Sequence, residues 1–260
     1  MIGQLTGLEN NMKKLYGYFM EPQNFSVNDG EGIRTIIFFA GCPLRCQWCA
    51  NPEGIYVKNQ FVKEYSIDEL IRIIDRQEVF YRYSGGGVTF SGGEAALQRD
   101  VLRELTNILY NRAINLTIET SGYFEFDSVR DILEKLDLIF IDIKHMDAGK
   151  HKLFTGIGNE KILKNISRLN EVNDNVVVRI PIIDGVNSDD KNIEETARFV
   201  RTQIKNPKIE LLPYHNFGDK KYEALGMEKP SRNFMRPPDR HINHLEEIVK
   251  AEGVEIVCYL

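Results

Sequence analysis

The sequence predicts an α/β fold, a partial barrel of six parallel strands, each followed by a helix. Short apolar, β-branched runs alternate along the chain with longer segments whose apolar residues recur at helical spacing. Polar clusters follow one strand after another, as expected where the carboxyl ends of parallel strands form one functional face. The 260 residues suffice for one domain with a full core. Because six strand–helix units are fewer than a closed eight-stranded barrel needs, we expect the barrel to be open.

The expected strands are rich in valine, isoleucine and phenylalanine. The first, Arg34–Ala40, leads directly into a loop that contains three cysteines. The other barrel strands are expected at Val88–Ser91, Ile114–Glu119, Leu138–Ile143, Val176–Ile180 and Lys208–Leu212. At the two ends of the chain, Tyr16–Asn28 is predicted to form an edge hairpin and Val254–Cys258 an edge strand.

The expected helices carry apolar residues on one face. The first begins at Ser66, where Glu69 three residues later completes a capping box, and extends to about Arg82. Asp127 is expected to cap a helix over Phe126–Leu136. The other predicted helices are Leu97–Asn111, Glu160–Asn170, Ser188–Ile204 and Asp239–Ala251.

Three of the four cysteines, Cys42, Cys46 and Cys49, lie close together after the first strand. Neighbouring thiolates repel unless a metal neutralises them, and sulfur ligands favour zinc, copper(I) or iron–sulfur clusters. Zinc sites usually pair their ligands, but the one remaining cysteine is the distant Cys258. Iron–sulfur clusters normally use four cysteines, so three would leave one iron open to another ligand. The spacing therefore favours an iron–sulfur cluster with an open iron, with a zinc site as the alternative.

A glycine-rich segment, Ser91-Gly92-Gly93-Glu94, follows the second strand. Glycines allow a ligand to approach the backbone closely. Glu94 adds a carboxylate that suits a ligand ammonium group. The alternative interpretation is a turn with a solvated glutamate.

Polar residues also follow the third and fourth strands. Glu119, Thr120 and Ser121 suit a cation or ligand hydroxyl groups, or a helix cap. Asp142 and Lys144 point in the same direction because side chains alternate along a strand. Such a pair suits the two ends of a zwitterion, and a structural salt bridge is the alternative.

The last two strands end in Arg179 and His215. Arg179 follows three valines, and an arginine is rarely buried without a partner, so we expect it to face a carboxylate of the ligand. His215 suits a contact with a ribose or with the substrate, and a structural role is equally consistent with the sequence.

Composition excludes several classes of function. The net charge is −5 and no basic block occurs, which argues against nucleic-acid binding. No apolar stretch reaches the ~18 residues of a membrane span, and residues 1–14 lack the apolar core of a signal peptide. We therefore expect a cytoplasmic protein with reduced thiols and no membrane partner, working where oxygen is scarce.

Together these motifs resemble the glycyl-radical-enzyme activating enzymes of the radical S-adenosylmethionine (SAM) superfamily, and in size and architecture the activators of pyruvate formate-lyase. The resemblance covers residues 29 to 226. The matching stretches are Asp29–Thr35, the cysteine loop, Gly85–Gln98, Asp142–Lys144, Arg179–Asn187 and Leu211–Gly218.

The resemblance implies a single radical SAM domain over residues 1–260, with residues 1–28 as an extension and a core at about 29–258. The cysteine loop is similar to that of the larger activators of decarboxylases, dehydratases and amine lyases. Those activators usually carry an inserted ferredoxin-like domain with further cysteines. Here Gly54–Tyr65 contains no cysteine, so we expect no insert and one cluster.

The resemblance also implies roles for the polar residues around the predicted barrel mouth. Cys42, Cys46 and Cys49 would ligate a 4Fe-4S cluster, with Trp48 beside it. The expected contacts of SAM are Gly92, Gly93 and Glu94 with its amino group, Thr120 and Ser121 along it, Lys144 and Arg179 at its carboxylate, and His215 near its ribose or the substrate loop. A monovalent cation would bind Glu119, Thr120, Asp142 and the carbonyl of Phe140, with Glu119 replacing the family's aspartate.

The implied reaction begins when a flavodoxin or ferredoxin reduces the cluster. SAM is then cleaved to methionine and a 5′-deoxyadenosyl radical, which takes a hydrogen atom from a glycine Cα of a partner glycyl radical enzyme. Asp29–Gly32 and His215–Gly226 are expected to contact this partner. The alternatives are a radical SAM enzyme acting on a small molecule or peptide, and a zinc or redox-sensing protein.

Overall fold

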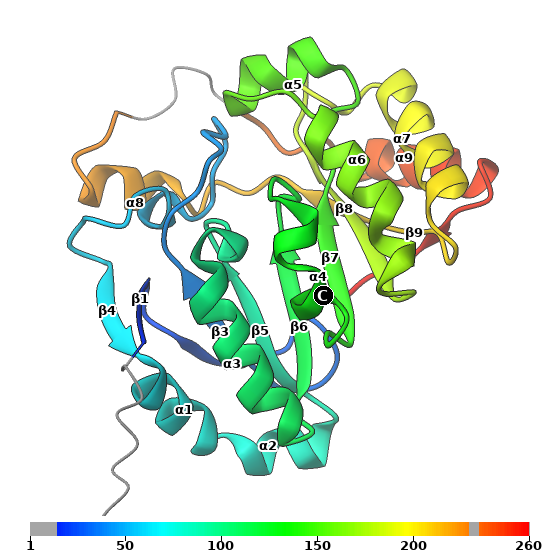
Figure 1. The fold of residues 1–260 in the computed structure, drawn as a ribbon. Helices are drawn as coiled ribbons and strands as arrows, with labels where there is room; N and C mark the ends of the chain where they lie inside the picture. The colour runs from blue at the N-terminus through cyan, green and yellow to red at the C-terminus, as the bar shows by residue number, and fades with distance from the viewer. Residues whose placement is uncertain (1–14, 229–233, 260) are drawn as a thin grey trace, which may run out of the picture.

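The computed structural model describes residues 15–228 and 234–259, and it shows a curved sheet with helices on its outer side (Figure 1). Six neighbouring strands are parallel, which confirms the predicted α/β partial barrel. Their bounds lie within two residues of those predicted. They are β3 (Arg34–Phe39), β5 (Gly87–Gly92), β6 (Asn115–Thr120), β7 (Leu138–Asp142), β8 (Val176–Ile182) and β9 (Lys208–Pro213).

Short strands extend both edges of the sheet. β1 (Tyr16–Phe19) and β2 (Gln23–Ser26) occupy the predicted hairpin, but both pair antiparallel with β3. β4 (Lys63–Ser66) pairs with β1 and was not predicted, because Lys-Glu-Tyr-Ser contains no apolar run. At the other edge, β10 (Glu255–Ile256) runs parallel to β9 and is shorter than expected.

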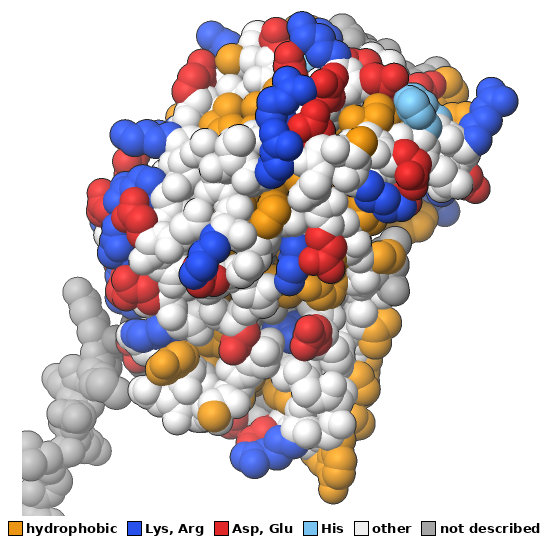
Figure 2. All heavy atoms as spheres, turned by 90° about the vertical axis from the view of Figure 1, so that its right-hand side faces the viewer, with side chains coloured by type: hydrophobic (Ala, Val, Ile, Leu, Met, Phe, Trp, Pro, Cys, Tyr) orange, Lys and Arg blue, Asp and Glu red, His pale blue; other side chains and the backbone are white. Residues whose placement is uncertain are grey.

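Helices cover the outer side of the sheet (Figure 1). None of the helices in the described part of the chain is long and apolar enough to cross a membrane. In the view of Figure 2, acidic and basic side chains are interspersed over the surface. The helices are α1 (Ile67–Asp75), α2 (Glu78–Ser84), α3 (Arg99–Asn111), α4 (Arg130–Leu133), α5 (Ala148–Thr155), α6 (Glu160–Arg168), α7 (Asp190–Gln203), α8 (Asp219–Ala224) and α9 (Asp239–Ala251).

The single helix predicted from Ser66 to Arg82 is wrong, because the chain turns after α1 and begins α2 separately. The predicted capping box is confirmed, with the Glu69 amide donating to Ser66 Oγ and the Ser66 amide to the Glu69 carboxylate. The turn directs Tyr81 of α2 inward, where its hydroxyl donates to Thr35 Oγ1 at 2.5 Å. A continuous helix would lose this anchor to β3.

The helix predicted over Phe126–Leu136 is also wrong. A 3₁₀ turn (Phe126–Ser128) and the one-turn helix α4 occupy the segment. Asp127 caps nothing, because its carboxylate pairs with Arg168 of α6 at 2.6 Å. The long-range ion pair therefore overrides the local capping preference. α5 and α8 were not predicted, since neither carries a clear apolar face.

The strands separate an apolar outer side from a polar inner side. Val88 and Phe90 of β5 belong to the core beneath the helices, whereas Thr89 and Ser91 bond to groups inside the barrel. Side chains alternate in the same way in β6 to β9, but the inner face there also holds a small apolar cluster of Leu138, Phe140 and Val177. The interior can therefore carry charged groups while the helices bury the apolar half of the sheet.

Arg34 closes the amino-terminal end of the barrel. Its side chain is fully buried and donates to Thr89 Oγ1 at 2.7 Å and to Thr117 Oγ1 at 2.9 Å. It also donates to Asn115 Oδ1 at 2.9 Å. With this end filled, the residues at the carboxyl ends of the strands remain to form a site.

Candidate functional site

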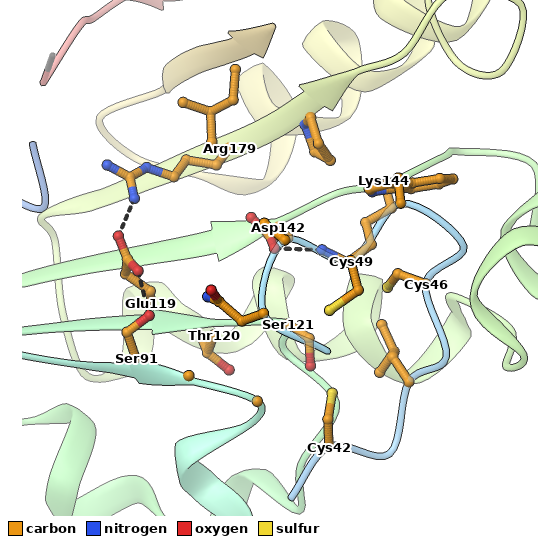
Figure 3. Close-up of a pocket in the computed structure, with 18 of the residues that line it drawn as sticks. Cys42, Cys46, Cys49, Ser91, Glu119, Thr120, Ser121, Asp142, Lys144 and Arg179 are labelled. Carbon is orange, nitrogen blue, oxygen red and sulfur yellow. Dashed lines mark hydrogen bonds and ion pairs between the residues drawn. The ribbon is translucent and has the colours of Figure 1, made fainter. Parts of the chain in front are cut away.

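A cavity of about 390 Å³ lies at the carboxyl ends of the barrel strands, beneath the cysteine loop (Figure 3). It contains nearly all residues that the sequence suggested as a site. Glu94 and Phe140 are the exceptions. The predicted residues that line it are Cys42, Cys46, Trp48, Cys49, Gly92, Gly93, Glu119, Thr120, Ser121, Asp142, Lys144, Arg179 and His215.

The cysteine loop is held by backbone bonds on both sides. The amide of Cys42 donates to the carbonyl of Ile55 at 3.2 Å, and the amide of Arg45 donates to the carbonyl of Thr155 at 2.7 Å. The amide of Cys49 turns back to the carbonyl of Cys46 at 3.1 Å. These bonds direct all three cysteine side chains toward one space (Figure 3).

The environment of these thiols indicates what they bind. Burial raises the pKa of Cys42 and Cys46 to about 12 and that of Cys49 to about 11. The thiols would ionise only with added positive charge, which a metal centre supplies. Among residues 15–228 and 234–259, no three His, Cys, Asp or Glu side chains converge on a single ion. The three thiols line one cavity of about 390 Å³, which has room for a cluster.

Gly92 and Gly93 let the cysteine loop pack directly on β5. Gly92 has φ of +116°, and a Cβ there would lie 2.3 Å from the carbonyl oxygen of Phe39. A Cβ on Gly93 would lie 2.4 Å from the carbonyl oxygen of Gly41. A side chain at Gly93 would push the cysteine loop away from β5, and a side chain at Gly92 would push the end of β3 away from β5.

Glu94 lies beneath the cavity wall and is fully buried. Its carboxylate accepts from Thr120 Oγ1 at 2.8 Å and from the amide of Ser121 at 2.9 Å. Burial raises the pKa of Glu94, and the bonds from Ser121 and Thr120 oppose this rise. Glu94 thus fixes Thr120 and Ser121, the two hydroxyl residues that line the cavity. A contact of Glu94 with a ligand ammonium group stays a prediction.

Lys144 and Asp142 form an ion pair in the cavity wall. Lys144 Nζ lies 2.5 Å from Asp142 Oδ2. Burial lowers the pKa of Lys144, but the charge and hydrogen bond of Asp142 together with the charges of Cys46 and Cys42 outweigh this effect, so the pKa is above its usual value. The ammonium therefore stays charged, and its remaining N–H donors are suited to a ligand carboxylate.

Arg179 links two carboxylates across the inner face of the barrel. Its Nε donates to Glu210 at 2.7 Å, and its Nη1 pairs with Glu119. Its guanidinium also lies 3.4 Å from the ring centroid of Phe140. Arg179 was expected to face a carboxylate of the ligand. It pairs instead with two carboxylates of the protein itself, those of Glu119 and Glu210.

Glu119 is the acid of this network with the most altered pKa. Burial raises its pKa to about 7, and Arg179 opposes the rise while Asp29 adds to it. Ser91 Oγ donates to Glu119 at 2.5 Å. Glu119 therefore changes charge near neutral pH.

The residues suggested for a monovalent cation do not converge as placed. Glu119 faces Arg179, and Asp142 faces Lys144, so each carboxylate already has a cationic partner. Thr120 Oγ1 is turned toward Glu94. With their side chains paired in this way, these three residues do not form a cation site. Binding of a monovalent cation therefore stays a prediction.

Aromatic residues close the cavity near the cysteine loop. Trp48 packs against Phe154 and Phe234, with ring centroids 5.8 and 5.9 Å apart. His215 stacks on Phe217 at 4.3 Å. Burial lowers the pKa of His215, as does the charge of Lys221, so the ring is neutral at physiological pH.

Sequence reasoning missed several residues of the site. Glu210 was not singled out, although a lone acid between apolar residues of β9 is a sign of an inward-facing charge. Asn28, Asn51 and Tyr214 line the cavity from loops. No local pattern marks such residues, because the fold of distant segments brings them together.

Comparison with known proteins agrees with this geometry. A profile described as the radical SAM superfamily matches residues 36–200, which include the cysteine loop and strands β5 to β8. The chain belongs to the radical SAM superfamily. A 4Fe-4S cluster and SAM are therefore its cofactors, and the three half-buried cysteines of the loop fit the cluster.

Relatives within the radical SAM superfamily narrow this assignment. The 4-hydroxyphenylacetate decarboxylase activating enzyme of Clostridioides difficile (strain 630) is 34% identical over 315 aligned positions, covering 96% of this chain and 98% of the relative. The (2S)-3-sulfopropanediol dehydratase activating enzyme of Klebsiella oxytoca is 32% identical, covering 93% and 96%. These matches group the chain with the activating enzymes of glycyl radical enzymes.

Solved structures support the radical SAM assignment. A domain of pyruvate-formate lyase-activating enzyme from Bacteroides vulgatus ATCC 8482 is 32% identical, with a TM-score of 0.54, covering 66% of this chain and 98% of that one. A radical SAM methyltransferase from Sphaerobacter thermophilus has a TM-score of 0.64 at 18% identity, covering 92% and 76%. The second likeness concerns the fold alone.

Proposed function

We propose that this radical SAM enzyme activates a partner glycyl radical enzyme by removing a hydrogen atom from a glycine Cα of that partner. One observation carries the proposal. The three cysteine thiols and the polar strand ends line a single cavity in a chain closely related to activating enzymes.

Each part of the cavity has a task in this proposal. Cys42, Cys46 and Cys49 hold the cluster. When bound, the cluster and SAM together supply the radical that attacks the glycine. Thr120 and Ser121, fixed by Glu94, line the cavity along SAM.

Lys144 is the cation best suited to the carboxylate of SAM. Its ammonium has three N–H donors, and Asp142 takes one of them. Arg179 is already occupied by Glu119 and Glu210, so we assign it to ordering the inner wall. The backbone of Gly92 and Gly93 lines the cavity beside β5, where we place the amino end of SAM.

We infer that the enzyme carries one cluster in a single domain. The alignment with the Clostridioides difficile relative spans 315 positions, so that relative has residues without a counterpart in these 260. Here the chain passes from the cysteine loop through β4 into α1, and residues 54–65 contain no cysteine. A flavodoxin or ferredoxin is the proposed electron donor, and reduced thiols favour the cytoplasm.

The partner's glycine must come within roughly 3–3.5 Å of the reacting atom, so a segment of the partner enters the cavity. Asp29 lies in the cavity wall, as does His215. Phe217, beside His215, is largely exposed. These positions support the two segments proposed for partner contact, Asp29–Gly32 and His215–Gly226.

The test uses anaerobically reconstituted enzyme and electron paramagnetic resonance (EPR). A four-iron signal that changes on adding SAM is expected after reduction. The enzyme is then mixed with a panel of five glycyl radical enzymes. They are pyruvate formate-lyase and the four enzymes that appear in the names of its relatives, namely 4-hydroxyphenylacetate decarboxylase, (2S)-3-sulfopropanediol dehydratase, trans-4-hydroxy-L-proline dehydratase and choline trimethylamine-lyase. A stable organic radical on one member is expected. SAM cleavage with no radical on any member would favour the alternative, a small-molecule or peptide substrate.

A further inference from the structure

Five apolar side chains of β2, α2 and the residues beside them are exposed to solvent. We call them the apolar patch, which consists of Phe25, Val27, Val79, Phe80 and Tyr83. Phe25 and Phe80 are in edge contact at a ring-centroid distance of 4.9 Å, so β2 and α2 share one surface here. Tyr83 is 91% exposed. Aromatic side chains left in water together are typical of a binding surface.

The backbone of Phe25 is strained. Its φ is +63°, a region that residues with bulky side chains rarely adopt. Such a conformation is unfavourable for a bulky residue, and here it coincides with the register shift between Gln23 and Ser26 in the pairing of β2 with β3. The strain does not serve core packing, because the side chain is 56% exposed. It presents an aromatic ring to the outside.

The apolar patch is adjacent in sequence to residues of the cavity wall. Val27 is followed directly by Asn28 and Asp29, which line the cavity wall. The carbonyl of Asn28 accepts from Arg179 Nη2 at 3.4 Å. A protein bound to the patch would therefore lie next to the wall that holds Arg179.

Two contacts link the end of α2 to the segment that follows Asp29. The amide of Ile33 donates to Ser84 Oγ at 2.8 Å, which joins the loop after Asp29 to the end of α2. Gly32 packs so closely on Gly86 that a Cβ would lie 2.4 Å from its amide nitrogen. These contacts hold α2 against the segment that leads from the cavity wall into β3.

We propose that the apolar patch is the docking surface for the glycyl radical enzyme that this enzyme activates, an inference that rests on the proposed function. A folded protein substrate must stay bound while its glycine segment occupies the cavity. Stable interfaces bury about 800 Å² on each partner, and aromatic anchors supply most of the binding energy. The patch offers three aromatic rings beside the cavity wall, and the partner supplies a matching apolar face.

The test introduces a charge at two exposed positions, Val27→Asp and Tyr83→Asp. The matched control is Tyr110→Asp on α3, where the tyrosine is 52% exposed. The partner is the panel member that acquires a radical with the unsubstituted enzyme. We expect each patch variant to raise the KM for this partner at least tenfold, with the partner-free cleavage of SAM by dithionite-reduced enzyme unchanged. Tyr110→Asp should leave both quantities unchanged.

Direct binding gives a second readout that does not depend on turnover. Biolayer interferometry should show the same tenfold loss of affinity between the immobilised partner and each patch variant. An unchanged KM and affinity in both variants would overturn the proposal. So would an equal fall in partner-free cleavage, which would place the effect inside the cavity.

Two further outcomes are distinct. If sedimentation shows a dimer of the unsubstituted enzyme that Tyr83→Asp dissociates, the patch is covered by a second copy and the proposal is wrong. If no panel member acquires a radical with unsubstituted enzyme, the proposed function fails before any variant is made. The docking proposal then fails with it.

Discussion

Lys221 of α8 forms an ion pair with Glu53 at 2.7 Å, beside the cysteine loop. The same ammonium donates to Asn51 Oδ1 at 2.9 Å, and Asn51 lines the cavity. Gly218, just before α8, lies so close to the loop that a Cβ would be 2.5 Å from the carbonyl oxygen of Cys49. Lys221 thus fastens α8 to the loop that holds the cluster.

We therefore expect Lys221→Met to weaken SAM binding about fivefold, with the iron content retained. The lysine side chain is 37% exposed, so the pair is partly screened and contributes about 1 kcal/mol. Equilibrium dialysis of SAM against reconstituted enzyme measures the effect. Lys220→Met, at an exposed neighbour, is the control and should bind SAM normally. Equal affinity in the two variants would contradict this role of Lys221.

Substitution of a cluster cysteine should abolish cluster binding. Cys46→Ser is expected to lose most of the iron and the EPR signal of the reduced cluster, because only two thiolates remain in the loop. Cys258→Ser, at an exposed cysteine distant in sequence, should keep both. Iron analysis and EPR of the two reconstituted variants measure the iron content and the signal of the reduced cluster. A full cluster in Cys46→Ser would show that the ligand assignment is wrong.

Glu119 should make the stability of the cluster-free protein depend on pH. Its pKa rises from the ordinary 4.5 to about 7 on folding, so between these values the folded state binds more protons than the unfolded state. The free energy of unfolding must then fall as pH increases through this window. Glu119→Gln removes this contribution. Urea denaturation at pH 5.5 and pH 7.5 should show a larger decrease in the unsubstituted protein than in the variant, and parallel changes would refute the assignment.

The fold was largely predictable because each barrel strand has an apolar outer half and is followed by a polar end. Val88 and Phe90 alternate with Thr89 and Ser91, and such patterns are local. The break between α1 and α2 was not predictable. It depends on the bond of Tyr81 to Thr35, which joins residues far apart in sequence.

The candidate site was predictable to the extent that its residues follow strands or sit in the cysteine motif. What the sequence did not indicate was the pairing of these residues. Arg179 was expected to face a ligand, yet it faces Glu119 and Glu210. Arg179 and Glu210 are register partners on the neighbouring strands β8 and β9, and Glu119 lies two strands away on β6. These pairings depend on the strand order and register, which no local sequence pattern gives.

Arg34 gives the sharpest test of how the barrel is closed. Its guanidinium donates to Thr89, Asn115 and Thr117 and to backbone carbonyls in a fully buried position. Lysine has three donors instead of five and lacks the planar fork, so Arg34→Lys would leave buried acceptors unpaired. We expect the free energy of unfolding to fall by about 2–4 kcal/mol. Chemical denaturation measures this, with Arg82→Lys as the control at a largely exposed arginine paired with Glu78. That control should change stability by less than about 0.5 kcal/mol, and an equally small effect at Arg34 would mean that its bonds do not hold the barrel end together.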